Sequence, residues 1–60
     1  KISYVPEGVM IISDDNNDLS IYDLQGQLLK RITINNKHII PLESGIYIFK
    51  IANKSYKIIR

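Results

Sequence analysis

The acidic run at residues 14–18, Asp-Asp-Asn-Asn-Asp, contains the side chains with the clearest potential for chemistry, because carboxylates and amides bind calcium. Its first, third and fifth residues match the first three ligand positions of an EF-hand loop. The match then fails, because Leu19 stands where the turn glycine belongs and Gln25 stands where the bidentate glutamate belongs. We therefore interpret the run as a polar hairpin loop of turn-forming residues and predict no metal site.

Several other side chains could take part in catalysis, but none has the neighbours that catalysis needs. His38 has no cysteine, second histidine or nearby carboxylate in the sequence, and we expect it to be an exposed residue at the start of a strand. The serines at positions 13, 20, 44 and 55 lack the glycine-flanked context of an activated nucleophile. The sequence thus predicts no catalytic residue, no cofactor and no enzyme activity.

The length and composition limit the chain to one small domain. It has 60 residues, no cysteine and a formal net charge of +2. Residues 1–60 are therefore expected to form one domain, interpreted as the C-terminal domain of a larger parent protein. A core of this size supplies little stability and no disulfide can add to it, so we expect help from the parent, a partner or self-association.

The charge pattern argues against two classes of partner and leaves one question open. The net charge is too small to predict nucleic-acid binding, and no apolar run is long enough to span a membrane. Residues 1–30 carry two basic and five acidic side chains, whereas residues 31–60 carry six basic and one acidic. Either the acidic residues 1–30 and the basic residues 31–60 face each other with opposite charges, or residues 31–60 present a basic recognition surface.

The elements that must position these residues are predicted to be short strands. Runs of four to eight Val, Ile, Tyr and Leu residues are separated by Asn, Asp, Gly and Pro, which is typical of an antiparallel all-β fold. No segment favours a helix. The pattern predicts seven strands, at residues 2–5, 8–13, 19–23, 27–34, 38–42, 45–52 and 55–60.

Four turn signals support these strands. Asp23-Leu24-Gln25-Gly26 places Asp first and Gly fourth in a type I turn, so we expect Gly26 to have positive φ and to close a hairpin. Asn53-Lys54 is predicted as a two-residue hairpin loop, and residues 35–37 (Asn-Asn-Lys) as another loop. Pro41 indicates an edge strand or a bend, because proline cannot donate to a ladder.

Strand alternation predicts the core and also an excess of apolar surface. Residues 8–13 and 45–52 are apolar on both faces, and a 60-residue chain cannot cover both. Some of Met10, Ile12, Ile46 and Ile48 should therefore be exposed, or buried by a partner or a second copy. The predicted core is Ile11, Ile21, Leu28, Ile32, Tyr47, Phe49, Ile51 and Ile58.

The order of motifs in residues 19–60 resembles the C-terminal sorting domain of proteins exported by the type IX secretion system of Bacteroidota. Tyr22, Asp23 and Gly26 match the first strand and turn of that family, and the segment 42–50 matches its Ser-Gly-apolar-Tyr strand. The basic apolar ending at 57–60 matches its terminal strand. The chain departs from the family at its start, where Val-Pro-Glu-Gly at 5–8 replaces a Pro-Asn-Pro type segment.

The resemblance implies a small antiparallel immunoglobulin-like β-sandwich of about seven short strands. Its function would be to direct an attached protein from the periplasm through the outer-membrane translocon to the cell surface or the medium, with later removal by a sortase-like peptidase. The alternative is a non-catalytic accessory module that packs on its parent or binds a protein or glycan at the cell surface. The residues expected to carry the family motif and recognition are Tyr22, Gly26, Gly45, Tyr47, Lys50, Lys57 and Arg60.

Overall fold

The computed structural model describes all 60 residues as one antiparallel sheet of five strands. The strands are β1 (Ile2–Val5), β2 (Gly8–Tyr22), β3 (Leu28–Pro41), β4 (Ile46–Ile51) and β5 (Lys54–Ile59). No residue lies in a helix, so the predicted all-β antiparallel fold is confirmed. Accordingly, no helical segment of the length and apolarity that a membrane span requires is present.

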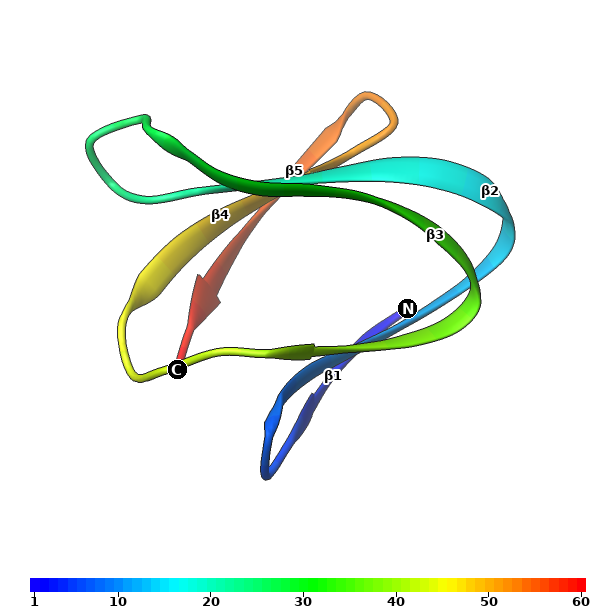
Figure 1. Cartoon of the computed structure of the whole chain (residues 1–60), viewed down its shortest axis with the longest axis horizontal. Coiled ribbons are helices and arrows are strands. Elements are labelled where there is room, and N and C mark those ends of the chain that lie inside the picture. The colour runs from blue at the N-terminus through cyan, green and yellow to red at the C-terminus, as the bar shows by residue number, and fades with distance from the viewer.

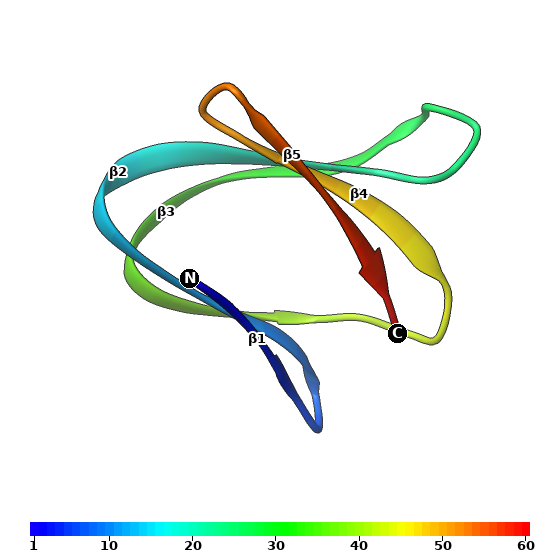
Figure 2. The ribbon, with the colours of Figure 1, turned by 180° about the vertical axis from the view of Figure 1, so that it is seen from behind.

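Strand β2 organises the sheet, because every strand except β5 pairs with it. β3 pairs along one edge of β2 over most of its length, whereas the other edge pairs first with β1 and then with β4. β5 pairs with β4 and completes the sheet. Figure 1 and Figure 2 show that the long β2–β3 ribbon curls strongly, so that the β1 end of the sheet comes to face the β4–β5 end.

The curl divides the sheet into two facing parts, which we call the first half and the second half. The first half contains β1, residues 8–13 of β2 and residues 36–41 of β3. The second half contains residues 17–22 of β2, residues 28–34 of β3, and both β4 and β5. Apolar side chains fill the space between them.

The acidic run forms the bend in β2 instead of the predicted hairpin loop. The β2–β3 register is interrupted between Ser13 and Asn17. Ser13 Oγ donates a hydrogen bond to the Asp15 carbonyl at 2.7 Å, and Asn17 Nδ2 donates to Ser13 Oγ at 2.9 Å. On β3, Asn36 takes a left-handed φ of 62° at the same level. Such an irregularity bends a strand without ending it.

The prediction of seven separate strands is therefore wrong in one respect. The segments 8–13 and 19–23 belong to the single strand β2, and 27–34 and 38–42 belong to β3. The polar residues between these segments favour loops in the sequence, because Asn and Asp are common in turns. In the structure they are the bulged middle of two long, paired strands, and no chain reversal occurs there.

The turn at Gly26 has the predicted conformation. Gly26 has φ of 86°, and its amide donates to the Asp23 carbonyl at 3.1 Å. The Gln27 amide donates to Asp23 Oδ1 at 2.9 Å, so the aspartate side chain also stabilises the turn. The prediction that this glycine closes the hairpin between β2 and β3 is confirmed.

The last hairpin turns one residue earlier than predicted. Ile51 pairs with Lys54, so the two loop residues are Ala52 and Asn53 instead of Asn53 and Lys54. Ala52 takes the left-handed conformation, with φ of 55°. The β4–β5 register therefore places Ala52 at the left-handed position, although asparagine adopts this backbone more readily than alanine. Pro41 ends β3, which is an edge strand as expected.

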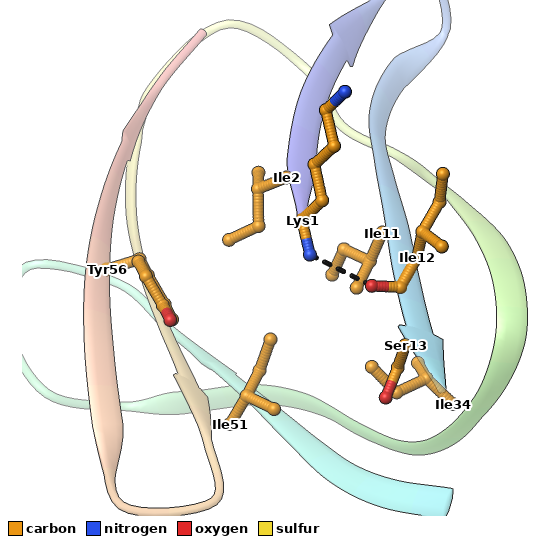
Figure 3. A pocket seen from close by; sticks show the side chains of 8 residues that line it. All are labelled: Lys1, Ile2, Ile11, Ile12, Ser13, Ile34, Ile51 and Tyr56. Atoms are coloured by element: carbon orange, nitrogen blue, oxygen red, sulfur yellow. Dashed lines mark hydrogen bonds between the residues drawn. The ribbon is translucent and has the colours of Figure 1, made fainter. Parts of the chain in front are cut away.

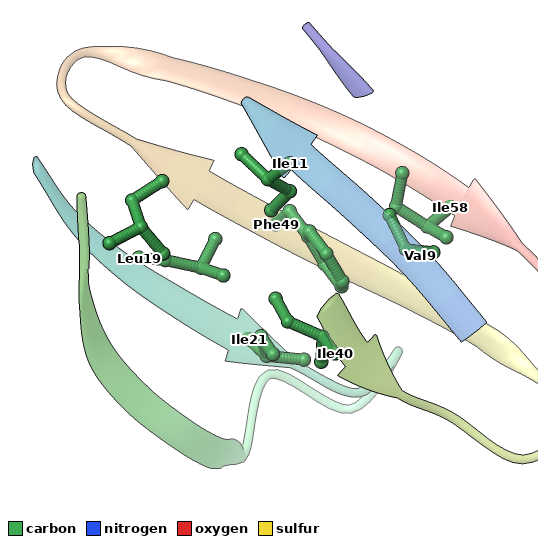
Figure 4. Packing of buried hydrophobic residues seen from close by; sticks show 8 residues of the cluster. Val9, Ile11, Leu19, Ile21, Ile40, Phe49 and Ile58 are labelled. Carbon is green, nitrogen blue, oxygen red and sulfur yellow. The ribbon is translucent and has the colours of Figure 1, made fainter. Parts of the chain in front are cut away.

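The core lies between the two halves of the sheet, as Figure 4 shows. Phe49 is fully buried at its centre and projects from β4 toward β2. Ile32, Tyr47 and Ile51, all predicted core residues, are partly buried and pack against the cluster. The eight buried apolar residues are Val9, Ile11, Leu19, Ile21, Ile34, Ile40, Phe49 and Ile58.

Leu28, a predicted core residue, is 49% exposed, so its placement in the core is wrong. The register shows why, because Ile21 pairs with Lys30 whereas Tyr22 pairs with Leu28. One extra residue, Leu29, is therefore inserted on β3, and it reverses the side of the sheet that the preceding residue faces. Leu28 consequently shares the outer face with Tyr22, away from Ile32 and Ile34.

Gly8 is required where the β1–β2 turn meets the end of β3. A Cβ atom at this position would lie 2.0 Å from the Ile40 carbonyl oxygen and 2.8 Å from the Leu42 amide nitrogen. The Leu42 amide also donates to the Glu7 carbonyl at 3.2 Å. Only a residue without a side chain allows the two backbones to approach so closely.

Candidate recognition surface

The outer face of the second half collects side chains from four strands. Successive residues of a strand point to opposite faces, and directly paired residues share a face. Because Phe49 points into the core, Ile48 and Lys50 point outward on β4. Their partners on β2 are Tyr22 and Ser20.

The same rule places the C-terminal strand on this face. Ile48 pairs with Lys57, and Ile46 pairs with Ile59. On the other side of β2, Ser20 pairs with Arg31. We call this surface the basic outer face; it consists of Tyr22, Arg31, Ile46, Ile48, Lys50, Lys57 and Ile59.

Contacts within this face position two of its three cationic side chains, Lys50 and Arg31. Lys50 Nζ lies 5.3 Å from the centroid of the Tyr22 ring, within the range of a cation–π interaction. Arg31 Nε donates to Ser20 Oγ at 3.3 Å, and the serine is only 8% exposed. Its hydroxyl lies between Arg31 and Lys50, its neighbours on the two adjacent strands. These cations are therefore positioned over the sheet.

Three of the seven predicted site residues, Tyr22, Lys50 and Lys57, meet on the basic outer face. Tyr22 comes from β2, whereas Lys50 and Lys57 come from the β4–β5 hairpin much later in the sequence. The basic outer face thus supports the interpretation of the C-terminal half as a basic surface.

The other four residues serve the backbone and packing. Gly26 forms the β2–β3 turn described above. Gly45 pairs with Arg60 beyond the ends of β4 and β5, with the Arg60 amide donating to the Gly45 carbonyl at 2.8 Å. Tyr47 is partly buried, and its hydroxyl donates to the Glu43 carbonyl at 3.0 Å. Its ring lies against Gly45, with ring carbons 3.5 Å from the position that a Cβ there would take.

As one of the residues expected to carry recognition, Arg60 should be an exposed charge, and this expectation is wrong. The residue is partly buried, and its Nη2 donates to the Pro6 carbonyl in the β1–β2 turn. Nearby, the Ile59 amide donates to the Tyr4 hydroxyl at 3.2 Å. Because Ile58 points into the core, Arg60 two residues later points the same way. The C-terminal residue therefore joins the first half of the sheet to the second.

Sequence reasoning missed the apolar members of the basic outer face as a group. Ile46 and Ile59 are 37% and 59% exposed, and they lie opposite each other on β4 and β5. The signal was present in part, because the two-sided apolarity of 45–52 predicted exposure of Ile46 or Ile48. The sequence did not indicate that Ile46 pairs with Ile59, or that Ile48 pairs with Tyr22.

A second candidate feature is an apolar groove between the two halves of the sheet, with a volume of about 380 Å³. Ile2 and Ile11 lie on one side of it, and Ile51 and Tyr56 lie on the other (Figure 3). The Lys1 backbone nitrogen at its rim donates to the Ile12 carbonyl at 2.9 Å. The groove is thus lined mainly by hydrocarbon and lies against the core.

The residues first considered for chemistry remain scattered. His38 is exposed within β3, opposite Ile11, so its expected exposure is confirmed although it does not start a strand. Asp14 and Asp15 are exposed at the bend, and Asp18 Oδ1 accepts a hydrogen bond from Thr33 Oγ1 at 3.0 Å. No group of three His, Cys, Asp or Glu side chains is close enough to hold a metal ion.

Comparison with known proteins gives one result. A family model described as a secretion system C-terminal sorting domain matches residues 5–60, which is nearly the whole chain. No curated protein matches the sequence, and no solved structure matches the fold.

Proposed function

This chain belongs to the family of secretion system C-terminal sorting domains, the export signals of type IX secretion, and we propose that the machinery reads it as a folded surface. A protein that carries such a domain is directed through the outer-membrane translocon to the cell surface or the medium. The domain is then a substrate of export and performs no reaction itself.

The observation that carries this proposal is the integration of the C-terminal strand into the sheet. β5 pairs with β4 along its whole length, and the ladder continues to the Gly45–Arg60 pair. Ile58 is 4% exposed in the core, and the Arg60 guanidinium reaches Pro6. A signal of this kind displays its residues only when folded, in contrast to an extended tail that is read along its length.

We further propose that the fold is an immunoglobulin-like sandwich in which the bends of β2 and β3 act as strand breaks. The two facing halves of the sheet then correspond to its two layers, and the seven predicted segments correspond to its strands. The packing of Val9 and Ile11 against Phe49 across the core supports this assignment.

The outer face of the first half is the proposed contact with the parent protein or with a second copy. Met10 pairs with Ile39, and Ile12 lies next to them on the same face. Ile12 and Ile39 are 41% and 43% exposed. Sedimentation of the domain at high concentration, compared with an Ile12→Ser and Ile39→Ser variant, measures whether this face associates with a copy.

The export function is tested by fusing residues 1–60 to a periplasmic reporter in a host with an intact type IX translocon. The reporter is expected at the cell surface or in the medium, and in a translocon-deficient host it should stay in the periplasm. A Phe49→Ala fusion, which should not fold, tests the need for a folded signal. Retention of the intact fusion in the periplasm would leave an accessory β-module as the better description.

A further inference from the structure

The basic outer face combines exposed apolar side chains with an excess of cationic side chains, and we propose that it docks an acidic protein surface with an apolar centre. This inference rests on the proposed function, because the export machinery would supply that surface. It adds the particular face that is read and the chemistry of its partner.

The apolar part of the face is continuous across three strands. Ile46 and Ile59 form a direct cross-strand pair, and Ile48 connects Tyr22 on β2 with Lys57 on β5. Ile59, at 59% exposed, is among the most exposed large apolar residues of the chain. An apolar strip of this kind, bordered by charged residues, is typical of a protein-binding surface.

The charge of the face determines what kind of partner fits. Arg31, Lys50 and Lys57 all project from it and are all exposed. Asp18 lies on the same side of the sheet, where its Oδ1 accepts the Thr33 hydroxyl, and its one carboxylate leaves a net charge of +2 (three cations and one anion). A partner must therefore bring carboxylates of its own to neutralise these cations, and opposite potentials also speed association.

The same features disfavour two other occupants. A second copy would set the same three cations against each other, and like charges across an interface are costly. Proteins that bind a membrane surface typically use an amphipathic helix or a lipid chain, whereas these isoleucines lie along the strands of a sheet face. An acidic protein is the occupant that satisfies both the charge and the shape.

The experiment compares two double charge reversals in the reporter fusion. Lys50→Glu with Lys57→Glu changes the basic outer face. Lys30→Glu with Lys54→Glu makes the same change in net charge at exposed positions off that face. Surface delivery by the first variant should fall by about tenfold or more, and delivery by the second should stay within about twofold of the parent fusion.

Two further measurements make the result decisive. If the glutamate variant fails to fold, as judged by protease resistance, Lys50→Gln with Lys57→Gln replaces it. A photo-crosslinking residue at Ile59 should attach to peptides rich in Asp and Glu, whereas one at Leu24, equally exposed in the turn, should not. Flotation with phosphatidylglycerol vesicles tests the membrane as the source of negative charge.

The possible failures are distinguishable. If the unaltered fusion is not delivered, the proposed function fails. If it is delivered and the Lys50 and Lys57 variants are delivered equally well, only the docking surface is wrong. Equal losses in both double variants, crosslinks to non-acidic peptides, or vesicle binding that depends on Lys50 and Lys57 would each overturn the acidic-protein assignment.

Discussion

Replacement of Gly8 by alanine should destabilise the domain more than the same replacement at Gly26. The Cβ atom that Gly8→Ala adds would lie 2.0 Å from the Ile40 carbonyl oxygen and 2.8 Å from the Leu42 amide nitrogen, both of them backbone atoms. Neither can rotate away, so β2 and β3 must separate by more than about 1 Å, roughly the shortfall from van der Waals contact.

The magnitude follows from two costs. Overpacking of a tight site costs about 1–3 kcal/mol. Separation of the strands also lengthens the 3.2 Å hydrogen bond from the Leu42 amide to the Glu7 carbonyl, which contributes about 1 kcal/mol. The sum, about 2–4 kcal/mol, is comparable to the whole stability expected of a domain this small.

Gly26 provides the matched control because its strain has a different origin. Its φ is 86°, but nothing lies within 4 Å of an added Cβ. Alanine at this position should lower the free energy of unfolding only by the cost of a left-handed backbone, about 1–2 kcal/mol. Urea denaturation followed by circular dichroism measures both variants. A midpoint for Gly8→Ala equal to the parent's, or higher than that of Gly26→Ala, would contradict the proposed close approach.

Three further predictions concern the core, the last turn and the C-terminus. Phe49→Ala removes the largest fully buried side chain and should cost about 3–5 kcal/mol, which leaves no cooperative thermal transition. Ala52→Gly relieves the left-handed φ of 55° and should raise the free energy of unfolding by about 0.5–1 kcal/mol; a lower denaturation midpoint would show that the loop is misassigned. Arg60→Ala, which loses the hydrogen bond to the Pro6 carbonyl, should lower the free energy of unfolding by about 1 kcal/mol. Lys57→Ala should change it by less than about 0.5 kcal/mol. Equal urea-denaturation midpoints for these two variants would argue against the Arg60 contact.

The division of the site residues into two groups changes how the family motif is interpreted. Gly26, Gly45 and Arg60 stabilise turns and ladder ends, so their substitution should reduce export through unfolding. Lys50 and Lys57 are exposed, and their substitution should leave folding almost intact. Measurement of both stability and surface delivery for each variant therefore separates display of the signal from its recognition.

Several features could be predicted from the sequence because they depend on local chemistry. Alternation of apolar residues at period two identifies strands and the residues that share a face, as in Tyr47, Phe49 and Ile51. Asp23 and Gly26 define a turn by their own side-chain and backbone preferences. The order of the terminal motifs was sufficient to indicate the family, which the match over residues 5–60 confirms.

Other features depended on how the strands meet in space. The alternation of β4 does not say which face is the core, and only the curl of β2 and β3 buries Phe49 and leaves Ile48 outside. Leu28 follows the alternation of its strand until one inserted residue reverses it. Local sequence reports the period of a strand, whereas its neighbours, its register and its buried face come from contacts between distant segments. The basic outer face is such a product, because Tyr22, Lys50 and Lys57 become neighbours only when β2, β4 and β5 pair.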